Sequence, residues 1–186
     1  MAAFLIIGIV IAILIVVAIL FSYYNKIVLA SNRIDNAWSQ IDVQLKKRAD
    51  LVPNLVETVK GYAKHEKGIF TEVAKARERM LKQTDPAKKM KEANQFAAAL
   101  KSIFAIAENY PQLRASENFK LLQEQLDGIE SKIAYSRQFY NDGVMGYNNA
   151  ISTVPGIWFA KMMGRTQQKP YLETPKGERG PVKVNF

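Results

Sequence analysis

The chain has 186 residues, a formal net charge of +9 at pH 7 and no cysteine. Without cysteine it can form no disulfide, no thiolate metal site and no cysteine nucleophile. The positive charge raises nucleic acid as a partner, but the basic residues are scattered among acidic ones, and a basic domain beside an anionic leaflet needs no nucleic acid to explain it. We expect membrane-surface electrostatics and no nucleic-acid partner.

Residues 2–21 form an unbroken apolar run without a charged side chain. About 20 apolar residues in a helix cover a hydrocarbon core of roughly 30 Å, so the run predicts one membrane span. A cleaved signal peptide would need basic residues before a shorter apolar core and a small-residue cleavage site, which this sequence does not offer. We expect an uncleaved anchor at residues 1–25, with Tyr23, Tyr24 and Lys26 at the membrane interface.

Charge asymmetry predicts the orientation of the anchor. Lys26 is the first basic side chain, Arg33 and Lys46 follow, and only the α-amino group of the chain precedes the apolar run. Positively charged flanks tend to stay on the cytoplasmic side of a membrane. We expect a single-pass protein of the inner (cytoplasmic) membrane, with its N-terminus outside and its domain in the cytoplasm.

The chain after the anchor reads as helical. Apolar residues recur at steps of three and four, and no stretch alternates long enough to predict a strand. No glycine or proline separates the anchor from the apolar stripe at 27–45, so the anchor should continue into the first helix of the domain. Pro53 should end that helix, because proline lacks a backbone N–H. A second helix should begin near residues 50–53 and reach about Met80.

Two more helices complete the prediction. Asp85-Pro86 provides a capping side chain and a proline in the first turn of a third helix, which Asn109-Tyr110-Pro111 should end. A fourth should begin at Ser116-Glu117 and carry its apolar stripe to Ile151. Four helices with short connections predict an all-α fold, an antiparallel up-down helical bundle over residues 26–154.

Two segments follow the bundle. Residues 155–163 form a short amphipathic piece, which either packs on the bundle end or enters the membrane interface through Trp158 and Phe159. Residues 164–186 are rich in proline, glycine and charge, and this composition predicts a disordered tail.

No group of residues predicts catalysis. His65 is the only histidine and Glu66 follows it, but a zinc-protease helix requires a second histidine where this chain has Ile69. Motifs for phosphate binding and for serine hydrolases are missing. We expect no catalytic residue, no metal site and no cofactor. Glu130 and Arg137 interrupt the fourth stripe, either as a buried ion pair or as solvated edge charges.

Residues 24–77 carry the sequence YNKIVLASNRIDNAWSQIDVQLKKRADLVPNLVETVKGYAKHEKGIFTEVAKAR, which resembles the LemA family of bacterial membrane proteins. The resemblance continues through AENYPQLRASENFKLLQEQL at 107–126 and IAYSRQFYN at 133–141. It implies an anchored antiparallel bundle with no agreed activity and no catalytic residues to carry over. The block at Arg48–Val59 and the AENYP turn become candidate interaction surfaces, and the candidate residues are Arg48, Pro53, Asn54, Lys60, Glu108, Tyr110 and Pro111.

The leading hypothesis is therefore a non-enzymatic scaffold or adaptor in the membrane that binds protein partners, of unknown identity, through its bundle. Self-association as a homo-oligomer is left open. The alternative is lipid-surface binding or membrane remodelling, which the basic flank and the segment around Trp158 favour. A hydrolase is the third hypothesis, with His65 as its only candidate residue.

Overall fold

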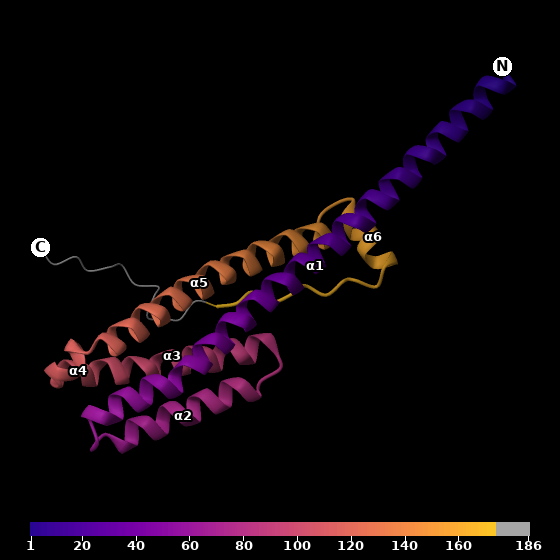
Figure 1. The fold of residues 1–186 in the computed structure, drawn as a ribbon. Coiled ribbons are helices and arrows are strands. Elements are labelled where there is room, and N and C mark those ends of the chain that lie inside the picture. The colour runs from indigo at the N-terminus through magenta and orange to yellow at the C-terminus, as the bar shows by residue number, and fades with distance from the viewer. Residues whose placement is uncertain (174–186) are drawn as a thin grey trace, which may run out of the picture. The chain divides into compact units, whose positions relative to one another are not determined.

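A computed structural model describes residues 1–173 of the chain. These residues form six helices, and no strand occurs among them. The helices are labelled in Figure 1, and their bounds are α1 (Ala2–Tyr62), α2 (Lys67–Lys82), α3 (Pro86–Asn109), α4 (Pro111–Ala115), α5 (Glu117–Ser152) and α6 (Gly156–Met162). The predicted all-α fold is confirmed.

The helices group into two compact units. Unit 1 joins the chain up to Ala37 with residues 138–171, and unit 2 joins residues 38–137 with Leu172 and Glu173. Both units contain part of α1 and part of α5, and the two helices pack together within each. In unit 1, Gly143 of α5 lies directly against Ile34 of α1. In unit 2, Arg48 of α1 pairs with Glu130 of α5.

The N-terminal part of α1 is the candidate membrane anchor. By length and composition, α1 is the one helix in the described part of the chain that could cross a membrane, and none of its most apolar stretch is buried. Burial begins at Ile27 and continues at Ile34, where α1 meets its neighbours in unit 1. An apolar helix surface that long, left uncovered by the protein, is typical of a segment whose solvent is lipid.

The expected continuity between the anchor and the first bundle helix is confirmed, because α1 runs unbroken from Ala2 to Tyr62. The predicted helix end at Pro53 is wrong, since Pro53 lies inside α1. A proline leaves the carbonyl four residues earlier without its helical donor. Here that carbonyl belongs to Ala49, and Nε of Arg77 on α2 donates to it at 2.7 Å. The side chain thus replaces the missing backbone donor.

The chain reverses direction ten residues later than predicted, at residues 63–66 between α1 and α2. His65, which the sequence placed within a helix, is exposed in this turn. The second and third helices, α2 and α3, lie side by side in unit 2 (Figure 1). The core of unit 2 is made of fully buried aliphatic and aromatic side chains, among them Leu45, Leu55, Val59, Met80, Phe96, Ile103 and Leu113.

The helix boundaries from residue 85 onward agree with the sequence signals. Asp85 caps α3 by accepting a hydrogen bond from the Lys88 backbone N–H at 2.9 Å, with Pro86 in the first turn. Tyr110 follows the last residue of α3, and Pro111 opens α4, a one-turn helix that the sequence did not predict. Pro111 both ends one helix and begins the next because its missing N–H is an orphan in the first turn anyway.

Replacing Asp85 with alanine should lower the free energy of unfolding by about 1 kcal/mol, because the Lys88 N–H loses its acceptor. Thermal unfolding of the full-length protein in detergent, followed by circular dichroism, measures this loss. Asp85→Asn is the matched control, since its side-chain oxygen can still cap the helix. Equal losses in the two variants would show that the cap contributes nothing beyond its charge.

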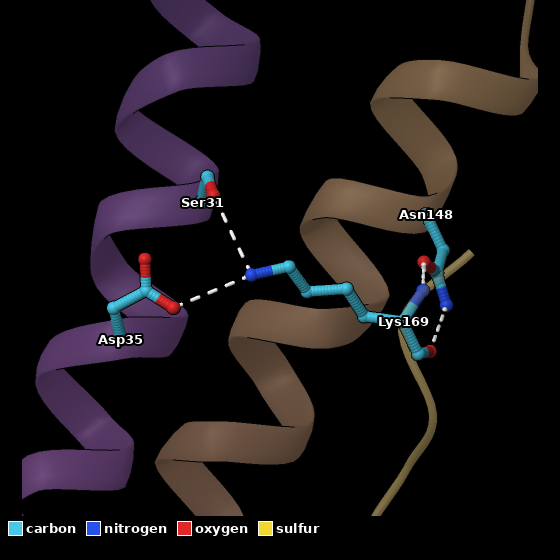
Figure 2. Close-up of polar contacts among 4 residues, drawn as sticks. All are labelled: Ser31, Asp35, Asn148 and Lys169. Carbon is cyan, nitrogen blue, oxygen red and sulfur yellow. Dashed lines mark hydrogen bonds and ion pairs between the residues drawn. The ribbon is translucent and has the colours of Figure 1, made fainter. Parts of the chain in front are cut away.

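The segment after α6 makes contacts that the sequence did not reveal. The Lys169 N–H donates to Oδ1 of Asn148 at 2.9 Å, and Nδ2 of Asn148 donates to the Lys169 carbonyl at 3.0 Å. Figure 2 shows the Lys169 side chain reaching α1, where its ammonium lies 3.3 Å from Oδ1 of Asp35 and 3.5 Å from Oγ of Ser31. The tail predicted to be disordered thus includes Lys169, which is held against α5 and α1 in unit 1. Its residues 174–186 lie outside the described part.

Candidate interaction sites

Arg48, a candidate surface residue, lies in the core of unit 2 and is 3% exposed. It forms an ion pair with Glu130 of α5, whose side chain is 51% exposed. Burial, and secondarily the nearby Arg137 guanidinium, lowers the pKa of Arg48 to about 10, so it remains charged at neutral pH. Glu130 therefore forms an ion pair with Arg48 of α1, a partner that the sequence did not predict. Arg137 donates to the Glu173 carbonyl at 2.6 Å.

A cavity of about 280 Å³ lies beside this ion pair, between α1, α3 and α5. Its charged lining consists of two basic residues, Arg48 and Lys101, and two acidic residues, Asp127 and Glu130. Because these charges cancel, the cavity offers no net attraction for an ionic ligand. Among residues 1–173, no three His, Cys, Asp or Glu side chains are grouped so that they could hold a metal ion.

A groove runs along α1 and α2 on the surface of unit 2, and we call it the α1–α2 groove. One part, of about 520 Å³, has a mainly apolar lining that includes Val52, Pro53 and Val73. The other, of about 640 Å³, is bordered by Lys60, Lys64, Lys67, Phe70, Thr71 and Ala74. The two parts share Lys60, Phe70 and Ala74, so they are continuous.

Two predicted surface residues, Pro53 and Lys60, line the α1–α2 groove, and Asn54 is exposed on α1 outside its lining. The ammonium of Lys60 lies 5.5 Å from the centroid of the Phe70 ring, within range of a cation–π contact. Sequence reasoning missed Lys64, which lies in the turn after α1, and Lys67, which is the first residue of α2. The sequence predicted one helix through this region. It therefore did not predict the chain reversal at residues 63–66 that brings these lysines close to Lys60.

The AENYP turn forms a separate surface of unit 2. Glu108 borders a pocket of about 620 Å³ together with Lys101, Phe104 and Arg114. Tyr110, half-buried, and Pro111, exposed, lie at the junction of α3 and α4 outside that pocket's lining. The predicted interaction residues thus fall in three places: the core, the α1–α2 groove with its neighbourhood, and the α3–α4 turn.

The predicted membrane-interface residues gather in unit 1. The rings of Tyr23 and Phe159 stack with centroids 5.0 Å apart, and the Lys26 ammonium lies 5.7 Å from the Tyr23 centroid. Tyr24 and Trp158 are exposed. Helix α6 therefore packs on α1 through Phe159, as one of the two sequence alternatives for this segment held, whereas Trp158 is exposed and its contact with a membrane stays a prediction.

Comparison with protein families matches residues 37–186 to the LemA family. Among individual proteins, the chain is similar to magnetosome proteins MamQ 2 and MamQ 1 of Paramagnetospirillum magneticum strain AMB-1, each 24% identical over 188 residues, covering 87% of this chain and 69% of the relative. It is also similar to magnetosome protein MamQ of Magnetospirillum gryphiswaldense, 24% identical over 181 residues, covering 83% of this chain and 66% of the relative. The family match covers most of the chain, unit 2 included, and the chain therefore belongs to the LemA family.

Proposed function

We propose that this protein is a non-enzymatic, membrane-anchored scaffold or adaptor that binds a protein partner through its helical bundle. The observation that carries the proposal is the α1–α2 groove, an open apolar surface with lysines at one end. Its position on α1, the helix that also contains the candidate membrane span, supports a role in holding a partner at the membrane. The relatives are named as magnetosome proteins, and no reaction is carried over from that name.

The chemistry of the groove favours one kind of occupant. The apolar surface that it exposes comes from Pro53, Val56 and Ala74, which suit the apolar stripe of an amphipathic helix. Its end carries Lys60 on α1, Lys64 in the turn and Lys67 on α2, and all three are exposed. Complementary charges steer association and fix the orientation of a partner. The proposed occupant is therefore an acidic amphipathic helix of another protein.

The orientation of the anchor is part of the same proposal. Lys26 and Arg33 follow the apolar run, and no basic side chain precedes it. This bias supports a single-pass protein of the inner membrane with its N-terminus outside and its bundle in the cytoplasm. Cytoplasmic partners would then reach the groove.

Site-specific photocrosslinking in intact cells tests the proposal. A photoreactive amino acid at Thr71, which lines the groove, should give a discrete protein adduct, whereas one at Ser131 on α5 should not. Ser131 is a matched control: both hydroxyls are exposed, and each donates only to the carbonyl four residues earlier in its helix. Peptide mapping of the adduct should place the crosslink in an acidic helical segment.

Charge reversal separates recognition from accidental proximity. Converting the three groove lysines to glutamate should abolish the Thr71 adduct, while the same change at three exposed lysines elsewhere should leave it intact; these controls are Lys91, Lys120 and Lys132. Adducts of equal yield at Thr71 and Ser131, or an adduct that survives reversal of the groove lysines, would refute the proposal. An adduct between two copies of this chain would replace it with self-association.

A further inference from the structure

Helix α6 is held at the point where the apolar run of α1 ends. Tyr23, which stacks on Phe159, is two residues beyond the run, or about 3 Å along the helix axis. Gly156, the first residue of α6, is packed so closely that an added Cβ would collide with the Ala150 carbonyl. Ala160 is fully buried. Three contacts therefore fix one face of α6 on the rest of unit 1.

The opposite face of α6 is apolar and uncovered. Trp158 is 59% exposed and Met162 is 76% exposed, and their spacing of four residues puts them on the same side of the helix. Tyr24 on α1, next to the Tyr23 that stacks on Phe159, is 52% exposed. Tryptophan and tyrosine side chains with this exposure are typical of the boundary between hydrocarbon and headgroups, where an aromatic body meets a polar edge.

The charges in this region have one sign. Residues 1–34 and residues 143–168 contain no aspartate or glutamate, so the ends of unit 1 around α6 carry only the positive side chains of Lys26, Arg33, Lys161 and Arg165. Lys161 lies on α6 itself, and Arg165 is tied to its end through a backbone hydrogen bond to the Ala160 carbonyl at 2.9 Å. A wholly cationic surface with an exposed apolar face complements anionic lipid headgroups.

From these observations we infer that α6 is an interfacial helix that seats on anionic lipid headgroups beside the membrane span. Trp158 and Met162 enter the boundary of the acyl region, and Lys161 and Arg165 contact headgroup phosphates or carboxylates. The surface is continuous with the membrane contact of α1, which is why lipid is its occupant. This inference is independent of the partner that the α1–α2 groove binds.

The test uses the full-length protein in lipid nanodiscs, with Trp38→Phe so that Trp158 is the single fluorescent tryptophan. Lipids brominated on the acyl chain near the headgroup should quench Trp158 about twofold more than lipids brominated near the chain end. Adding anionic lipid to a zwitterionic disc should strengthen this quenching. Circular dichroism confirms that the Trp38→Phe protein keeps its helices.

Charge-neutral variants identify the headgroup contact. Lys161→Gln with Arg165→Gln should remove about half or more of the response to anionic lipid, because each basic side chain near the surface contributes to the attraction. Lys120→Gln with Lys132→Gln removes the same charge from exposed sites on α5 in unit 2 and should change nothing. An equal effect of both pairs would overturn the assignment of Lys161 and Arg165, and a Trp158 signal that ignores anionic lipid would overturn the choice of ligand.

Two further outcomes would overturn the inference entirely. If acrylamide quenches Trp158 in nanodiscs as strongly as it quenches the free amino acid tryptophan in water, the apolar face of α6 stays in water. If Trp158 is shielded from acrylamide but is not quenched by brominated lipid, a protein surface covers it, either a second copy of this chain or another partner.

Discussion

Truncating Glu130 to alanine is expected to destabilise the bundle by about 2–3 kcal/mol, because it leaves the Arg48 guanidinium buried without a counter-charge. Arg48→Met should cost less, within about 1 kcal/mol. The difference follows from unequal burial: Arg48 is 3% exposed, whereas the Glu130 side chain is 51% exposed and can be hydrated when its partner is gone. Methionine also fills much of the volume that the arginine stem occupied.

Chemical unfolding of the full-length protein in detergent, followed by circular dichroism, compares the two variants. The double variant Arg48→Met with Glu130→Ala should be more stable than Glu130→Ala alone, because the buried charge has been removed along with its partner. A larger loss for Arg48→Met than for Glu130→Ala would contradict this account and would mean that the ion pair itself, and not the desolvated charge, dominates.

The pH dependence of the same comparison has a defined sign. The pKa of Arg48 is lowered by burial to about 10, so the unfolded chain binds this proton more tightly than the folded protein does. The positive charge of Arg48 therefore opposes folding at every pH below about 10, and this opposition weakens as pH rises past that value. The stability difference between Arg48→Met and the wild type should be constant from about pH 6 to pH 8, where Arg48 stays protonated in both states.

Helices α3 and α5 could be predicted because their boundaries depend on local chemistry. Asp85 with Pro86, Tyr110 with Pro111, and Ser116 with Glu117 each act within one helical turn. The apolar run at 2–21 is equally local, since its length alone matches a bilayer. Such signals need no knowledge of what packs where.

The features that the sequence did not predict depend on contacts between segments that are distant in the chain. The pairing of Arg48 with Glu130 joins residues 82 positions apart, and a periodic stripe does not tell which helix faces which. The burial of Arg48 could not be predicted for the same reason, because arginine at the edge of a stripe is usually solvated. The α1–α2 groove could not be predicted because the sequence signals put the chain reversal at Pro53, ten residues before its position at residues 63–66.

Pro53 shows why a local signal can mislead. The loss of a helical hydrogen bond at this proline was predicted correctly, but the helix does not end there. The proline does remove a helical hydrogen bond. Ala49, whose carbonyl loses the donor, is 0% exposed, so water does not replace the bond, and Nε of Arg77 does so instead at 2.7 Å. A helix can continue through proline where a neighbouring helix supplies the missing donor, and sequence alone does not reveal that neighbour.

A double-mutant cycle on Pro53 and Arg77 should measure this substitution directly. Pro53→Ala restores a backbone donor for the Ala49 carbonyl and should raise the free energy of unfolding by about 1–3 kcal/mol. Arg77→Met in the wild-type background should lower it by about 1–3 kcal/mol, because a buried carbonyl is left without a partner. In the Pro53→Ala background the same change should lower it by less than about 1 kcal/mol.

The ion pair between Arg77 and Asp50 is the competing explanation for any effect of Arg77→Met. Its atoms are 3.9 Å apart and Asp50 is well exposed, so the pair should contribute little. Asp50→Asn removes that pair and leaves the bond to Ala49 intact, and it should therefore change stability only slightly in either background. If Arg77→Met is equally damaging with proline or alanine at position 53, the arginine stabilises α2 by packing alone. A coupling of about 1 kcal/mol or more would show that Arg77 serves as the missing backbone donor of α1, which is how the helix stays continuous from the apolar run to Tyr62.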